Sequence, residues 1–294
     1  MAKQIKEKSS ISTLNIIKRE FSRDIGALIA VGVVIAAVLF VIIVPLLIDQ
    51  EWALGMHPRR INNPPSAEHW LGTDVGGRDV FARLAVGARN SLAITIAVTL
   101  MSAFIGIVLG VISGYFGGRF DNIVMRVVDF VSTLPALVMI IAFLAIVPGF
   151  NVTRFSLVMT FFLWPGIMRL VRARSIQEKE LEYIQASKTL GTPHIKTIFR
   201  ELLPNISTII IVNLTLNTAA NVGLETTLSF LGFGFPFDEP SLGSLISAAS
   251  DPIVMQHRWW IWLPAALFVL VLMLAINTIG RTLGRATDAR QRRG

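Results

Sequence analysis

Four polar side chains recur at a fixed spacing inside an otherwise apolar stretch of this sequence. They follow one another every fourth residue: Asn213, Asn217, Asn221 and Glu225. On a helix such a series forms a polar stripe that winds slowly around the axis. Amides and a carboxylate at membrane depth face protein or water, because contact with lipid is costly. The stripe predicts either a lining that hydrogen-bonds a passing solute, which we favour, or hydrogen bonds that lock a helix bundle.

The sequence offers no comparable set for covalent or nucleotide chemistry. There is no cysteine, which excludes disulfides and thiolate metal ligands. The four histidines (His57, His69, His194 and His257) lack the spacing of metal ligands. No Gly-x-x-x-x-Gly-Lys-Ser/Thr sequence occurs, so we expect no ATP binding through a P-loop. We expect neither an enzyme nor a cofactor or metal held by this chain.

A second polar feature is the charged island at residues 178–204, which lies between apolar segments. The Gly-Thr-Pro sequence at 191–193 predicts a sharp corner: the glycine ends one helix, the threonine caps the next, and the proline begins it. Two short helices, 178–190 and 193–203, should therefore meet there. Their charges would be costly in lipid, so the hairpin protrudes into water, where a soluble partner can hold it. A DNA-binding helix-turn-helix is disfavoured, because membrane spans flank the island and both helices carry acids.

Composition indicates a multi-pass membrane protein. Hydrophobic residues make up 53% of the chain and charged residues only 16%, against roughly 25% charged in soluble domains. The first apolar run is too long for a signal-peptide core and is read as a retained span. The fourth apolar run is the shortest. It is long enough to span the membrane only if Arg169 and Arg172 reach toward the headgroups. The alternative is a re-entrant segment. The predicted spans are 25–48, 90–118, 123–147, 155–173, 205–224 and 259–280.

Basic residues predict the orientation of these spans. Of the 27 Lys and Arg, 20 lie in segments that are cytoplasmic if both termini are inside, and 7 lie in the others. This bias favours cytoplasmic N and C termini. It also accounts for the net charge of +8 without any nucleic acid as a partner.

Several spacings predict contacts between or along the spans. Arg126 and Asp129 stand three residues apart and are expected to pair. Trp259, Trp260 and Trp262 are expected to anchor the last span at the membrane interface. Small residues every four positions should let another helix approach the second span closely: Ser102, Gly106, Gly110 and Gly114.

The region 69–92 carries the strongest resemblance to a known family. It reads His-Trp-Leu-Gly-Thr-Asp-Val-Gly-Gly-Arg-Asp over 69–79, followed by Arg-Leu at 83–84 and Gly-Ala-Arg-Asn-Ser-Leu over 87–92. This resembles the signature before the second span in C-type permeases of dipeptide and oligopeptide ABC importers. The two adjacent glycines permit a tight turn that the charged residues can tie. The signature residues are Gly72, Thr73, Asp74, Gly77, Arg78 and Asp79.

The charged island resembles the Glu-Ala-Ala loop of the same permeases, with Gln185-Ala186-Ser187 in place of that triplet. In the family this loop is a coupling helix that docks into a groove on an ATPase subunit. The resemblance implies an ATPase-coupling role for Glu182, Gln185, Ala186, Ser187, Gly191, Thr192, Pro193, Leu203 and Pro204. A third match covers residues 228–243. In the family, this region lies on the side of the membrane that receives substrate from a binding protein. Leu242 there replaces the family's tryptophan, and Arg281 replaces a later aspartate.

Together these matches cover the chain from Trp70 to Asp288 and imply an all-α, six-span, type I ABC importer permease fold. The expected segments are a cytoplasmic tail (1–24), a first transmembrane helix (25–48), an extracytoplasmic loop (49–90), a permease core (91–281) containing the hairpin 178–204, and a basic cytoplasmic tail (282–294).

The resemblance also implies a bacterial inner-membrane complex. Its members would be a second, B-type permease subunit, two cytoplasmic ATP-binding subunits that hold ATP and magnesium, and an extracytoplasmic solute-binding lipoprotein, all in contact with membrane lipid. Peptide import is the expected function, since amides can bond peptide backbones whatever the side chains. Nickel or metal-chelate import is the alternative within the family. An ion-coupled secondary transporter is more distant, because it predicts inverted repeats and broken helices that the sequence does not show.

Overall fold

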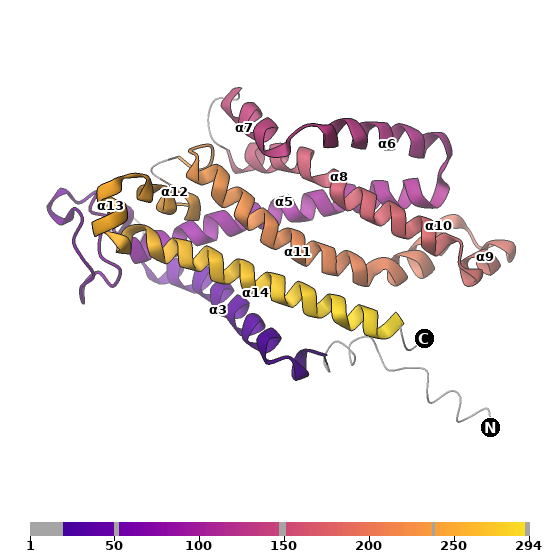
Figure 1. Ribbon diagram of the computed structural model, residues 1–294, viewed down its shortest axis with the longest axis horizontal. Coiled ribbons are helices and arrows are strands. Elements are labelled where there is room, and N and C mark those ends of the chain that lie inside the picture. The colour runs from indigo at the N-terminus through magenta and orange to yellow at the C-terminus, as the bar shows by residue number, and fades with distance from the viewer. Residues whose placement is uncertain (1–19, 50–52, 147–150, 237–238, 292–294) are drawn as a thin grey trace.

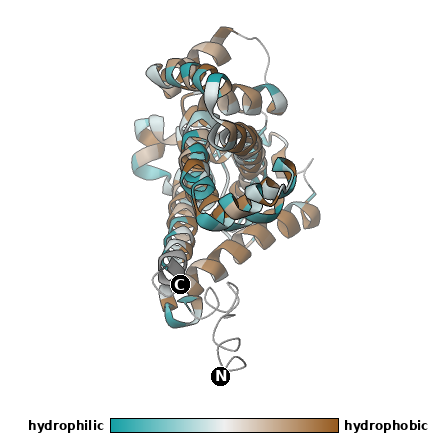
Figure 2. Ribbon diagram, turned by 90° about the vertical axis from the view of Figure 1, so that its right-hand side faces the viewer, coloured by the Kyte–Doolittle hydropathy of each residue, from teal (hydrophilic) through white to brown (hydrophobic). Residues whose placement is uncertain are grey.

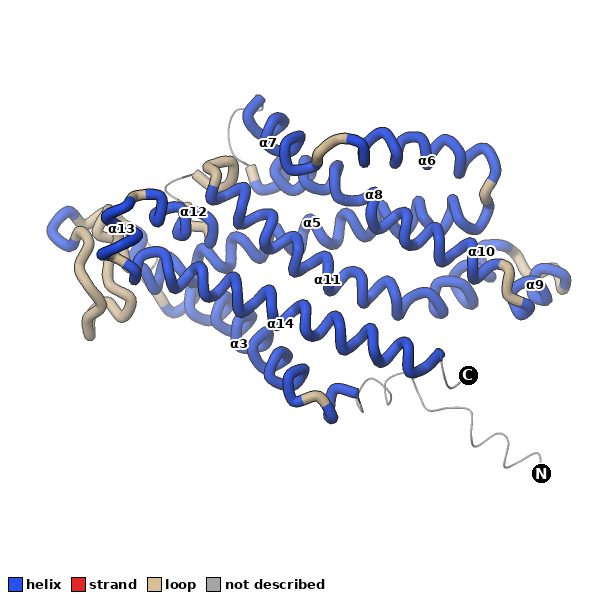
Figure 3. Tube along the Cα trace, in the orientation of Figure 1, coloured by secondary structure: helices blue, strands red, loops and turns tan. Residues whose placement is uncertain are grey.

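The computed structural model describes residues 20–49, 53–146, 151–236 and 239–291. Within these ranges the regular structure is helical, joined by loops (Figures 1 and 3). Five long helices form the bundle: α3 (Ile25–Leu47), α5 (Val80–Phe116), α8 (Val152–Lys179), α11 (Leu203–Phe230) and α14 (Trp259–Gln291).

Short elements gather at the two ends of the bundle (Figure 1). One end carries η1 (Pro58–Arg60), α12 (Leu242–Ser247), η3 (Ala248–Ser250) and α13 (Pro252–His257). The other carries α9 (Glu182–Thr189), α10 (His194–Thr197) and the π-helical segment η2 (Ile198–Leu202). The start of α3 and the end of α14 point toward the α9 end, and Asp24, which caps α3, pairs with Arg285 of α14.

All six predicted spans have a helical counterpart. Five helices are long and apolar enough to cross a membrane, and a bent pair supplies a sixth if it counts as one span. That pair is α6 (Gly118–Thr133) and α7 (Ala136–Ile146), which meet at 83°. The span predicted over 123–147 is therefore broken by a bend, and its last residue lies outside the described ranges. The cause is Pro135, which disfavours helical geometry at Leu134, whose φ is −82° and ψ 134°.

Most spans continue as helices past the ends predicted from hydropathy. α5 begins ten residues before the predicted span at 90, and α14 reaches Gln291 rather than 280. α8 runs unbroken from Val152 to Lys179, so the re-entrant reading of the fourth span is wrong. Hydropathy marks the part of a helix that suits lipid, whereas backbone hydrogen bonding continues into water.

Glycines bring α5 and α8 into backbone contact, as their spacing predicted. A Cβ added to Gly106 would lie 2.8 Å from Cβ of Ile167, and one added to Gly114 would lie 2.6 Å from Cβ of Ser175. Between them, a Cβ at Gly110 would lie 2.8 Å from the Met168 carbonyl oxygen. No side chain larger than hydrogen fits this seam without a shift of α8.

Ion pairs join α6 to α8 beside that seam. Arg172 donates two hydrogen bonds to Asp121, at 2.5 and 2.6 Å. Asp129 accepts a hydrogen bond from Arg169 at 2.7 Å. The expected pairing of Asp129 with Arg126 is not what the structure shows, because the carboxylate faces α8 while Arg126 is exposed on α6.

Substituting Gly110→Ala should destabilise the protein by about 1–3 kcal/mol, because the added methyl forces α5 away from α8. Thermal unfolding of the purified protein in detergent measures the loss. Gly166→Ala is the matched control, since a Cβ there meets nothing within 4 Å. Equal unfolding midpoints for the two variants would show that the seam is not close-packed.

Candidate functional site

The hairpin of α9 and α10 turns at a glycine with a left-handed backbone. Gly191 has φ 79°, its N–H donates to the Lys188 carbonyl, and the next N–H, of Thr192, donates to the Ser187 carbonyl. This pair of bonds is the Schellman motif that ends many helices. The predicted helix stop at Gly191 is confirmed.

The second arm of the hairpin differs from its prediction in three ways. Pro193, not Thr192, occupies the N-cap, and no side chain caps α10. The helix does not end at Leu203: it passes through η2 directly into α11. Pro204 has no N–H and its ring would crowd the carbonyl four residues earlier. The wider π turn before it, in which the Leu203 N–H bonds the Ile198 carbonyl, accommodates this.

The first arm of the hairpin is also shorter than predicted. The expected helix over 178–190 is split, because α8 ends at Lys179 and α9 begins at Glu182. α9 then presents two faces. Ile184 is fully buried against Ile198 and Leu202, whereas Glu182, Gln185 and Ala186 are exposed.

Large apolar side chains are exposed at the turn of this hairpin. Leu190 is 86% exposed and Ile195 71% exposed. Seen from the hairpin end, hydrophilic residues gather at the centre of the view, where the hairpin end faces the reader, and they also occur on parts of the neighbouring, otherwise hydrophobic helices (Figure 2). A charged hairpin with apolar side chains at its turn suits a soluble protein partner better than lipid.

The two departures from the family triplet have structural roles. Gln185 donates from its amide to the Lys179 carbonyl at 2.8 Å, which ties α9 to the end of α8. Ser187 donates to Oε1 of Glu201 at 2.7 Å and thereby joins the two arms. Both polar side chains form hydrogen bonds within the hairpin and its junction with α8, rather than extending away from it toward a partner.

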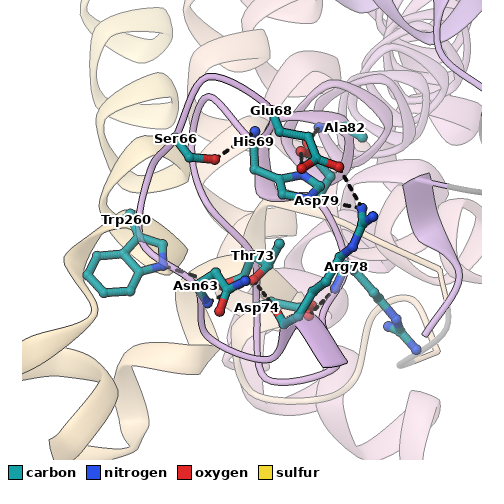
Figure 4. Close-up of polar contacts among 11 residues, drawn as sticks. Asn63, Ser66, Glu68, His69, Thr73, Asp74, Arg78, Asp79, Ala82 and Trp260 are labelled. Carbon is teal, nitrogen blue, oxygen red and sulfur yellow. Dashed lines mark hydrogen bonds and ion pairs between the residues drawn. The ribbon is translucent and has the colours of Figure 1, made fainter. Parts of the chain in front are cut away.

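At the opposite end, the signature loop folds around a buried carboxylate (Figure 4). Oδ1 of Asp74 accepts the N–H groups of Gly76 at 2.7 Å and Arg78 at 2.9 Å, and Oδ2 pairs with Arg83. Asp79 caps α5 through the Ala82 N–H at 2.8 Å. Asp74 and Asp79 tie this turn as predicted, whereas Arg78 takes part through its backbone N–H and Arg83 is the ion-pair partner that sequence reasoning missed.

Two further contacts hold the same loop in place. Nδ1 of His69 lies 2.7 Å from Oδ2 of Asp79. The indole of Trp260 donates to the Thr73 carbonyl at 3.3 Å, which joins the loop to α14. Trp260 therefore bonds the signature loop, a contact that its prediction as an interfacial anchor did not include.

The loop needs glycine at two points. Gly72 has φ 68° and Gly77 φ 74°, and a Cβ at Gly77 would lie 2.0 Å from the His57 carbonyl oxygen. Both positions have a left-handed backbone, and both lie close to another segment of the loop, since a Cβ at Gly72 would lie 2.5 Å from the Asn63 carbonyl oxygen.

The polar stripe on α11 divides into two halves. Asn221 and Glu225 are buried: Asn221 donates to Thr99 of α5 at 2.9 Å, and Glu225 accepts from Ser229 at 2.7 Å. Asn213 and Asn217 are half-buried, and their main contacts are with each other, at 2.6 Å between side chains. Asn221 fits the bundle-locking alternative because its bond crosses to α5, whereas the Glu225–Ser229 bond lies within α11. The half-buried part remains available to a solute or a partner.

Comparison with known proteins identifies the family. A model described as "Binding-protein-dependent transport system inner membrane component" matches residues 106–293, which is more than half of the chain. The chain belongs to this family. It is a multi-pass inner-membrane permease of a transport system that depends on a binding protein, and not an enzyme.

Curated relatives extend the similarity to almost the whole permease. It is 45% identical over 287 residues to the oligopeptide transport system permease protein OppC of Lactococcus lactis subsp. cremoris (strain SK11), covering 97% of this chain and 98% of the relative. It is 32% identical to OppC of Bacillus subtilis (strain 168) over 97% of this chain and 92% of the relative. It is 36% identical to the dipeptide transport system permease protein DppC of the same strain, over 79% and 72%.

Substituting Asp74→Asn should destabilise the permease by about 3–5 kcal/mol, because Arg83 loses its counter-charge inside the protein. Thermal unfolding and limited proteolysis of the signature loop measure the effect. Glu68→Gln is the control: its carboxylate pairs with Arg60 at 3.1 Å but is 65% exposed, so we expect a loss of less than about 1 kcal/mol. Equal losses for both variants would contradict the role given to Asp74.

Proposed function

We propose that this chain is the C-type permease subunit of an ATP-driven peptide importer. It forms half of a translocation pore with a B-type permease. Its hairpin couples the pore to two cytoplasmic ATPase subunits that bind ATP and magnesium, and an extracytoplasmic lipoprotein delivers the peptide. The chief support is 45% identity along nearly the full chain to a permease named for oligopeptide transport.

The arrangement of the two ends supports the coupling role. The hairpin lies at the same end of the bundle as the start of α3 and the end of α14, and the signature loop lies at the other (Figure 1). With both termini cytoplasmic, as the basic residues favour, the hairpin faces the ATPases and the signature loop faces the binding protein. The exposed residues Glu182 and Ala186 then face the cytoplasm, while the Gln185 side chain braces the hairpin.

The exposed leucine at the turn of the hairpin allows a test of ATPase docking. Leu190→Glu should weaken ATPase association about ten- to a hundredfold, because burial of one leucine contributes roughly 1.5–3 kcal/mol. Co-purification and titration with the ATPase subunits in detergent measure this. Met56→Glu, an equally drastic change at an exposed residue of the outer loop, serves as control. Undiminished association of Leu190→Glu would remove the turn from the docking surface.

Orientation is tested in the same complex, since the chain has no cysteine of its own. A single Thr192→Cys should react with a membrane-impermeant maleimide in inverted membrane vesicles and not in intact spheroplasts. The reverse pattern would place the hairpin outside and refute the coupling role.

The half-buried part of the polar stripe is proposed to line the pathway, where amides can bond peptide backbones of any sequence. Asn217→Leu should lower peptide uptake about tenfold, the effect of losing roughly 1.4 kcal/mol of hydrogen bonding to the passing solute, without changing the unfolding temperature. Uptake is measured with a labelled mixture of di-, tri- and oligopeptides, and with nickel as the competing substrate. Thr218→Val, which removes a bond to its own helix, is the control. If Asn217→Leu leaves uptake intact and lowers stability, the residue locks the bundle instead.

A further inference from the structure

The helix α5 runs the length of the bundle between the two ends of this permease. α5 is uninterrupted over 37 residues, which at 1.5 Å per residue gives roughly 55 Å. The helix begins at the signature loop and ends beside the hairpin (Figure 1).

The outer end of α5 contacts both the signature loop and the segment that leads into α12. Its first turn is capped by Asp79, and Arg83 pairs with Asp74 of the loop. Further along, the amide of Asn90 donates to the Pro240 carbonyl at 2.9 Å, and Ser91 accepts the N–H of Leu242, the first residue of α12, at 3.1 Å. A displacement of α5 must therefore move both the signature loop and α12.

At the inner end of α5, Tyr115 contacts both arms of the hairpin, and its neighbour Phe116 contacts the second arm, with its ring centroid 5.7 Å from that of His194. Tyr115 is buried, and its hydroxyl oxygen lies 3.1 Å from Nδ1 of His194 on the second arm. The two rings meet edge to face, with centroids 5.7 Å apart. From the first arm, Nζ of Lys188 lies 4.8 Å from the centroid of the Tyr115 ring.

Between these ends α5 has little freedom to bend. The glycine seam presses it against α8 along three successive turns. Near its inner end, Ser113 donates to Asp121 at 2.9 Å, the same carboxylate that Arg172 of α8 holds. A force applied at Tyr115 is thus transmitted by a helix that is stiffened from the side.

We propose that α5 is the rod that carries movement between the hairpin and the extracytoplasmic signature, and that Tyr115 is the positioning residue that fixes the hairpin to it. This rests on the proposed function, because it requires ATPase subunits that displace the hairpin. A hairpin that still binds the ATPases but has lost Tyr115 keeps fewer contacts with α5, such as that of Phe116 with His194, and would pass on less of its movement.

The test uses the full complex of both permeases, the ATPases and the binding protein in proteoliposomes. Tyr115→Phe removes only the hydroxyl, and Tyr115→Leu also removes the ring. Peptide uptake per ATP hydrolysed should fall about threefold in the first variant and about tenfold in the second. Basal ATP hydrolysis and ATPase association should stay unchanged, and stimulation of hydrolysis by the loaded binding protein should fall with uptake.

Tyr183→Phe is the matched control, since Tyr183 is the second of the chain's two tyrosines and lies on the same hairpin. Its hydroxyl contacts Glu178 and Asn205, and Asn205 donates to it at 2.8 Å. We expect normal uptake per ATP in this variant. The proposal is overturned if Tyr115→Leu keeps the wild-type ratio, or if Tyr183→Phe lowers it equally.

A second experiment controls for variants that assemble poorly. In the cysteine-free chain, Tyr115→Cys and His194→Cys together should uncouple uptake from hydrolysis, and a short thiol-to-thiol cross-linker between them should restore it. A verified cross-link that restores nothing overturns the rod proposal. If the wild-type chain binds no ATPase and shows no hydrolysis-driven uptake, the proposed function itself fails, which is a different result.

Discussion

The architecture of this permease depends on the contact between α5 and α8 at the glycine seam. Lipid tails solvate apolar side chains as well as protein does, so helices in a membrane associate by close packing rather than by burial from water. Glycines at 106, 110 and 114 let the two backbones approach until dispersion contacts and backbone dipoles act at short range. The α6 ion pairs and the inner hydrophobic cluster of Tyr115, Ile184 and Leu202 are built around this pair.

The two ends of the bundle are ordered by different means. At the end with the signature loop, the buried Asp74 satisfies backbone N–H groups and an arginine at once, so an irregular loop is fixed without secondary structure. At the other end, the hairpin uses a left-handed glycine and a few side-chain bonds, and leaves apolar side chains in solvent. The first arrangement buries its central carboxylate, whereas the second leaves Leu190 and Ile195 uncovered.

Much of this was predictable from the sequence. Apolar run lengths located the spans, the four-residue spacing of small residues located the seam, and Gly191 located the corner. What failed depended on geometry that periodicity does not carry. The break at Pro135 was a local backbone signal inside a long apolar run. The partner of Asp129 proved to be forty residues away, on a helix whose rotation no single sequence specifies. The roles of Tyr115 and Trp260 likewise depend on which helices become neighbours.

The π-helical segment between the hairpin and α11 has a consequence for the relative rotation of those two parts. Each residue of an α-helix turns the chain by about 100°, and a π turn holds one residue more than an α-helical turn would. The segment Ile198–Leu202 therefore sets the azimuth of α9 and α10 relative to the asparagines of α11. Regular α-helical bonding here would bring the ring of Pro204 against the carbonyl four residues earlier, so the wide turn holds this azimuth fixed. The wide turn thus fixes the direction in which the hairpin projects from the end of α11, without a break in the helix.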